Sequence, residues 1–156
     1  MTRSIALFLC LALPVTSFAA NNNSYKVNYD GGSVQNLKAG TDVQLLIDSD
    51  RVRIIKGKQE MVNIPAAAVT EISYGEDVHR RVGAAIGLAV VSLGVGALMA
   101  LTKSKKHYIG LTWADGDKKG GFAMQCDKSD YRGELTALEG ITGKKAVDSS
   151  ALTVKN

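Results

Sequence analysis

The sequence predicts a mainly β domain closed by one helix, and three features predict it. Short runs rich in β-branched residues alternate apolar with polar side chains and are separated by Asp, Gly and Ser, which is typical of an antiparallel sheet with one solvated face. An Asp115-Gly116 hairpin signal joins two further runs, and an apolar stripe at helical spacing follows them. We therefore expect a bent antiparallel sheet or open barrel of about seven strands with a C-terminal amphipathic helix, interrupted by a hydrophobic helical hairpin.

The first half of the chain contains most of the predicted strands. They are expected over residues 25–29, 33–37, 42–48, 51–56, 60–64 and 70–74. Val43, Leu45 and Ile47 fall on one face of the third of these strands, because successive side chains in a strand point to opposite sides. Pro65 closes the meander, and residues 66–69 are expected to form one helical turn.

The second half predicts a hairpin followed by a helix. The hairpin strands are residues 107–113 and 121–126, joined by the polar stretch 114–119. The helix is expected to begin near Asp127 or Ser129, either of which can cap it, and to stop at Gly140 or Gly143. Its apolar stripe consists of Tyr131, Leu135, Leu138 and Ile141.

Composition and the N-terminus predict an exported protein of one domain. Arg3, the apolar run 5–15 and Ser17-Phe18-Ala19 have the order of a secretory signal peptide, so residues 1–19 are interpreted as one, with an uncleaved anchor as the alternative. Residues 20–31 then form a lead, 32–143 the β-domain and 144–156 a disordered tail. Cys126 would be the one cysteine left, which excludes an intramolecular disulfide. The net charge of +4 is mild and the lysines are interleaved with aspartates, so nucleic acid is not an expected partner.

Residues 82–101 form an apolar run of twenty residues without a charge, inserted in the β-domain between positions 77 and 106. Its length reaches the roughly 18 residues at which a segment becomes a candidate membrane span. If the strands on either side share one sheet, both ends of the run lie on the same side of a membrane. The run then predicts a helical hairpin, with arms at 77–91 and 95–106 bent around Ser92–Gly96.

This hairpin assigns roles to particular residues. Basic residues at its ends are placed at the membrane interface, facing anionic lipid headgroups: Arg80, Arg81, Lys103, Lys105 and Lys106. Small residues are assigned to packing between helices: Gly83, Gly87, Gly94, Gly96 and Ala100.

Two other interpretations of the apolar run stay open. A straight single span is favoured by Glu76-Asp77 at one end and lysines at the other, which suit the dipole of one long helix. The other possibility is burial of the run within the protein or within an oligomer.

Strands in a meander, an insertion, a hairpin and a closing helix resemble the pleckstrin-homology-like superfold and its bacterial, GRAM-type relatives. The resemblance spans roughly Gly32 to Ile141 and includes Ile64-Pro65 through Val69-Thr70-Glu71-Ile72. It implies about seven strands in a strongly bent sheet with one open end plugged by a C-terminal helix. The chain has no basic phosphoinositide-binding loop between its first strands. A small lipocalin-like or other open barrel is the alternative fold.

The sequence does not predict an enzyme. Nucleophilic catalysis needs a base beside the nucleophile, and both histidines, His79 and His107, flank the apolar run. Cys126 alternates with Phe122 and Met124 as a buried small hydrophobe, and no clustered ligands for a metal or motif for a cofactor are present. We expect a non-enzymatic module of the cell envelope that binds a protein partner, a lipid or a small apolar ligand. A membrane oligomer packed through small residues is the alternative, and a single-pass membrane protein is the third possibility.

Overall fold

The computed structural model describes residues 23–87 and 106–149. Their elements are eight strands, two α-helices and one 3-10 turn. In chain order they are β1 (Asn23–Gly32), β2 (Thr41–Ile47), β3 (Arg51–Lys56), β4 (Gln59–Pro65), η1 (Ala66–Ala68), β5 (Val69–Tyr74), α1 (Val78–Ala85), β6 (His107–Asp115), β7 (Lys118–Cys126), α3 (Tyr131–Thr142) and β8 (Val147–Asp148).

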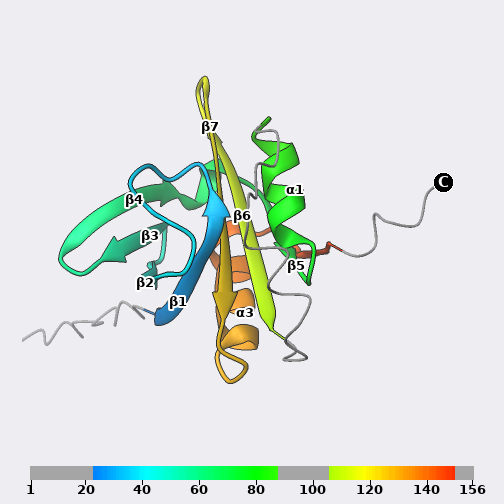
Figure 1. Ribbon diagram of the computed structural model, residues 1–156. Coiled ribbons are helices and arrows are strands. Elements are labelled where there is room, and N and C mark those ends of the chain that lie inside the picture. The colour runs from blue at the N-terminus through cyan, green and yellow to red at the C-terminus, as the bar shows by residue number, and fades with distance from the viewer. Residues whose placement is uncertain (1–22, 88–105, 150–156) are drawn as a thin grey trace, which may run out of the picture.

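All eight strands belong to one open, mixed sheet with the order β4-β3-β2-β1-β7-β6-β5-β8. Neighbouring strands are antiparallel except β5 and β8, which are parallel. In Figure 1 the half of the sheet formed by β2, β3 and β4 curves away from the half formed by β5, β6 and β7. The predicted β-rich class with a C-terminal helix is confirmed, but the described strands form a mixed sheet of eight strands where an antiparallel one of about seven was expected.

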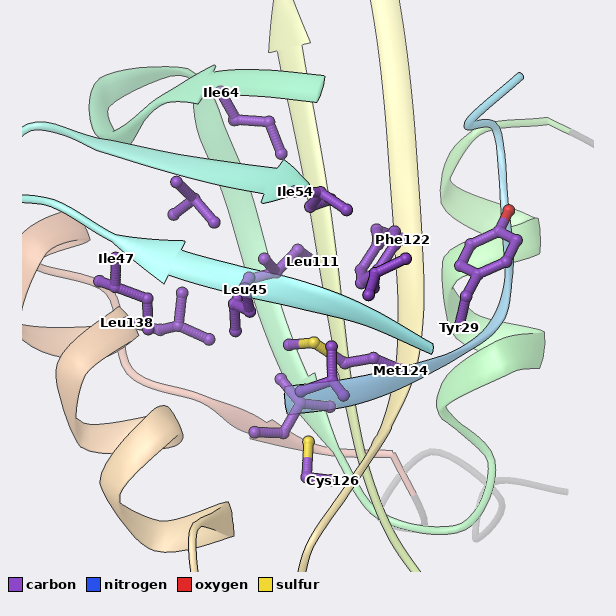
Figure 2. Close-up of a cluster of buried hydrophobic side chains, with 14 of the residues drawn as sticks. Tyr29, Leu45, Ile47, Ile54, Ile64, Leu111, Phe122, Met124, Cys126 and Leu138 are labelled. Atoms are coloured by element: carbon purple, nitrogen blue, oxygen red, sulfur yellow. The ribbon is translucent and has the colours of Figure 1, made fainter. Parts of the chain in front are cut away.

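The main core lies on the concave side of this bent sheet. Val43, Leu45 and Ile47 are all buried, which confirms the face predicted by their alternation. Figure 2 shows Leu138 of α3 beside Ile47 of β2, and both belong to the main buried cluster. The helix therefore covers the end of the core, as the resemblance implied.

The strand pair β6–β7 is buried on both faces. Ile109 and Leu111 point into the main core. Tyr108 and Ala123 belong to a second cluster, on the opposite face, with Val78 and Val82 of α1. A second apolar layer in a sheet needs a second cover, and α1 supplies it.

Local sequence signals set several element boundaries. The two-residue loop between Asp115 and Lys118 contains Gly116 at φ 58°, a left-handed conformation that glycine adopts without a steric penalty. Gly143 ends α3 at φ 68°. The helix begins later than predicted, at Tyr131, because the Asp127 carbonyl first accepts the Asp130 and Tyr131 N–H groups in a turn.

Three predicted boundaries differ from the structure. β1 occupies Asn23–Gly32, inside the predicted lead, and pairs with both β2 and β7, so the sheet begins well before residue 32. No strand forms at 33–37, because Gly32 and Asn36 both have positive φ and turn the chain. The predicted disordered tail is ordered as far as Ser149, because β8 hydrogen-bonds to β5.

The start of the apolar run differs most from prediction. Of the expected helical arm 77–91, the structure describes residues 77–87, and within them the helix runs over Val78–Ala85. Gly87 follows at φ 70°, which breaks a continuous helix at this point. The remainder of the expected hairpin, residues 88–105, lies outside the described residues. Within 23–87 and 106–149, no helix combines the length and apolar character needed to span a membrane.

Candidate functional site

Helix α1 is seated directly on the backbone of β6 and β7. A Cβ added at Gly110 would come within 2.6 Å of Val78 Cγ1 and 2.7 Å of Val82 Cγ2. A Cβ at Gly121 would come within 2.5 Å of the other Val82 methyl. Val82, predicted as the first residue of a membrane segment, is 1% exposed in this contact. The two glycines therefore form a shallow seat that this helix fills.

An ion pair fixes α1 against β5. The Arg81 guanidinium donates from Nε and Nη2 to the two carboxylate oxygens of Glu71, the second at 2.8 Å. The Arg81 side chain is 17% exposed and that of Glu71 32%. Two parallel hydrogen bonds to a carboxylate are strong and directional, so the role of Arg81 in this structure is to hold α1 against β5.

The other predicted interfacial residues are placed differently. Arg80 is 72% exposed and lies 3.9 Å from the Asp77 carboxylate. Lys106 lines a polar depression of about 460 Å³ beside β1 and β7, together with Lys26, Asn28, Asp42 and Gln125. Lys103 and Lys105 lie outside the described residues. The structure thus brings Arg80 and Arg81 together on α1 and directs them to different surroundings.

We expect these neighbouring arginines to respond differently to substitution. Arg81→Ala leaves the partly buried Glu71 carboxylate without its partner, so the free energy of unfolding should fall by about 1–3 kcal/mol. Arg80→Ala, the matched control at an exposed position, should change it by less than about 0.5 kcal/mol. Urea unfolding of both variants measures the difference; equal effects would contradict the structural role of Arg81.

Two of the five small residues assigned to helix packing lie within the part of the chain that the structure describes. Gly83 is half-buried on α1, and Gly87 is exposed just beyond its end. Ala84 and Ala85 are exposed as well, so small residues form the last turn of α1. Gly94, Gly96 and Ala100 lie outside the described residues, and their role stays a prediction.

Both ends of residues 88–105 meet the domain on the side of α1. Ile86 lies over Gly121, which pairs with Thr112 of β6. At the other end, Lys106 and His79 both lie near Asp30: burial raises the pKa of the Asp30 carboxyl, whereas His79 and Lys106 act to lower it. Thr112 and Lys106 are separated by about 20 Å of strand.

The edge of β5 that faces away from β6 is only partly covered by another strand. β8 covers this edge at Ser73 and Tyr74, with Val147 and Asp148 as the partner residues. Residues 69–72 of β5 have no strand on that side among the described residues. The backbone N–H and C=O groups of an uncovered strand edge readily pair with another extended segment.

The segment that covers β5 is held by contacts to three elements. Ala146 donates its N–H to Glu139 Oε1 of α3 at 2.7 Å, and Ser149 donates its N–H to the Tyr74 carbonyl of β5 at 2.7 Å. The Ser149 hydroxyl accepts the N–H of Asp77, the residue before α1, at 3.3 Å. A Cβ at Gly75 would lie 2.5 Å from that hydroxyl, so glycine makes room for it.

A buried carboxyl lies on the inward face of α3. Glu134 is 0% exposed, and neither of its carboxylate oxygens has a hydrogen-bond partner of ordinary geometry among the described residues. Burial, followed by the charges of Asp130 and Asp127, raises the pKa of this carboxyl to about 7, while the nearby Cys126 thiol acts to lower it. Sequence reasoning missed Glu134, although its place between Tyr131 and Leu138 on the apolar stripe was a signal.

Nucleophilic chemistry finds little support in the described residues. Burial, with Glu134 beside it, raises the pKa of the Cys126 thiol far above its usual range, as expected for a buried small hydrophobe. The His107 ring packs against Tyr131 with 4.6 Å between centroids. No group of three potential metal ligands occurs within residues 23–87 and 106–149.

Comparison with known proteins identifies the fold. No protein-family model and no curated protein matches the chain. Among solved structures, the C-terminal phosphotyrosine interaction domain of APBB2 from mouse is similar to it, with a TM-score of 0.52 and 10% sequence identity over 83% of this chain and 91% of that one. Such a domain has a pleckstrin-homology-like fold, so the predicted resemblance is supported at this coarse level. Its GRAM-type refinement stays a prediction.

Proposed function

We propose that this protein is a non-enzymatic binding module that takes up an extended polypeptide segment at the β5 edge. The observation that carries the proposal is β8: residues of this chain already lie along β5 as an added strand. Backbone hydrogen bonds supply affinity in such strand addition, and side-chain pockets supply specificity. The similar mouse domain is named for interaction with phosphotyrosine, which supports a peptide as the class of partner.

The test is an NMR titration of the isotopically labelled chain with a synthetic peptide of residues 144–156. Millimolar peptide competes with the chain's own segment, so amide shifts should be concentrated at residues 69–74. The matched control peptide carries proline at positions 147 and 149 and should produce no shifts, because proline has no N–H to donate. Shifts confined to α1 and Lys106 would overturn the proposal and move the binding site to the other face.

We further propose that residues after α1 hold this module against a membrane of the cell envelope after export. β5 and β6 flank the apolar run and are hydrogen-bonded to each other, so a single crossing would put bonded strands on opposite sides of the bilayer. This favours same-side insertion over a single span. With Val82 and Ile86 packed on the sheet, the apolar residues left for the membrane are 88–101, which suits shallow insertion at the interface.

Carbonate washing and vesicle flotation test membrane attachment. The mature protein should stay with the membrane pellet after carbonate treatment and should float with vesicles that contain anionic phosphatidylserine. Replacement of residues 88–101 by a Gly/Ser linker of equal length should abolish flotation while leaving peptide binding intact. Release of the unaltered chain by carbonate alone would remove the membrane proposal.

The small residues at the end of α1 support a second candidate, a structural oligomer in the membrane. Gly83 and Ala84 provide the close approach that helix packing in a bilayer uses. Gly83→Leu is a better probe than Gly87→Leu, because Gly87 has φ 70° and any side chain there is strained. Loss of a cross-linked oligomer with membrane attachment retained would favour assembly.

A further inference from the structure

The segment that covers β5 is held in a way that favours release. It pairs with β5 through two residues only, and Val147 is 37% exposed. Hydrogen bonds to Glu139, Tyr74 and Asp77 add to this pairing, and Ala146 packs at the margin of the main core. A strand attached mainly by backbone bonds exchanges more easily than one anchored in a core.

The same segment blocks the edge against other strands. Val147 and Asp148 pair with Ser73 and Tyr74, and the Ser149 N–H donates to the Tyr74 carbonyl. A second extended segment that continues along β5 beyond residue 72 meets these residues. Its access therefore depends on whether the chain's own segment is in place.

We propose that residues 146–149 are an autoinhibitory segment, which occupies the β5 edge in the free protein and is displaced when a partner peptide adds there. This inference rests on the proposed function of that edge. It accounts for the return of the chain from Gly143 to the β5 edge. A tethered segment competes at a high effective concentration, so its presence sets the threshold for binding.

Ser149 connects this displacement to α1. The Asp77 side chain makes no capping hydrogen bond at the start of α1, and the Asp77 N–H instead donates to the Ser149 hydroxyl. Loss of the segment removes that acceptor. Displacement at the β5 edge should therefore also loosen the first turn of α1, next to residues that lead into the apolar run.

The test compares binding of the fluorescently labelled 144–156 peptide to the full chain and to variants that release the segment. Ser149→Pro removes both the N–H that donates to Tyr74 and the hydroxyl that accepts from Asp77. Ser149→Thr keeps both groups and is the matched control. Glu139→Ala removes the Ala146 acceptor from the α3 side and provides a second variant that does not introduce proline.

We expect Ser149→Pro to bind the peptide roughly tenfold or more tightly than the unaltered chain, Glu139→Ala to bind with an intermediate gain, and Ser149→Thr to show no gain. Hydrogen exchange should be faster at Tyr74 and in the first turn of α1 in the Ser149→Pro chain. Equal binding by all chains would overturn autoinhibition while leaving the β5 site standing. Absence of binding by either release variant, with exchange at β5 accelerated, would overturn the site itself.

Discussion

The Gly110→Val substitution is expected to displace α1 from the sheet and to lower the free energy of unfolding by about 2 kcal/mol or more. Position 110 lies in β6 with an ordinary strand conformation, so the backbone accepts a side chain there. The neighbouring atoms leave no room for that side chain: a Cβ would lie 2.6 Å from Ser73 Oγ and 2.6 Å from Val78 Cγ1. Three contacts below 3 Å from two elements cannot all relax by rotation of one side chain.

The matched control is Gly31→Val. Gly31 is also in a strand without positive φ, and a Cβ there meets nothing within 4 Å. Its free energy of unfolding should stay close to that of the unaltered chain, as should its tryptophan fluorescence. Similar destabilisation by both substitutions would mean that α1 does not rest on Gly110, and residues 82–86 would return to the membrane segment.

Alternation was sufficient to predict most strands and their buried faces. The buried face of Val43, Leu45 and Ile47 could be predicted without tertiary information. In a sheet with one solvated face, a period of two residues allows only one assignment of the apolar side chains to the core. Gly116 and Gly143 likewise marked the hairpin loop and the end of α3 through their local conformations. The fold class was therefore predictable from short-range patterns.

The extent of the apolar run was not predictable in the same way. Val82 is as apolar in a membrane as it is against a sheet, and hydropathy cannot distinguish these environments. Small residues on the second face of β6 and β7, Gly110, Gly121 and Ala123, indicated that something packs closely there. Only the tertiary structure shows that α1 fills that place.

The candidate site depends even more on long-range pairing. Residues 144–149 have no strand pattern of their own, and they are ordered because the β5 edge and Glu139 supply partners. Ser149 lies 72 positions from Asp77, a separation at which no local signal predicts a hydrogen bond. Sequence reasoning consequently placed these residues in a disordered tail.

Glu134 should make the stability of the fold fall as pH rises from about 4.5 to about 7. Its pKa is raised from 4.5 to about 7, so the folded protein prefers the protonated carboxyl. The stability from this preference is fully present below the unfolded pKa and is lost as pH rises through the folded one. The shift corresponds to about 3 kcal/mol in the free energy of unfolding, and this whole contribution is lost above pH 7.

Glu134→Gln isolates this contribution, because glutamine has no charge to bury at any pH. The variant should be more stable than the unaltered chain at pH 8 by about 2–3 kcal/mol, and the advantage should vanish near pH 4.5. Urea unfolding at both values measures it, with Glu76→Gln at an exposed position as the control. A difference independent of pH would show that the carboxyl is already paired when ionised. Because Glu134 is a buried residue of α3 beside Cys126 and Tyr25, an advantage that vanishes near pH 4.5 would identify the docking of this helix as the pH-sensitive contact.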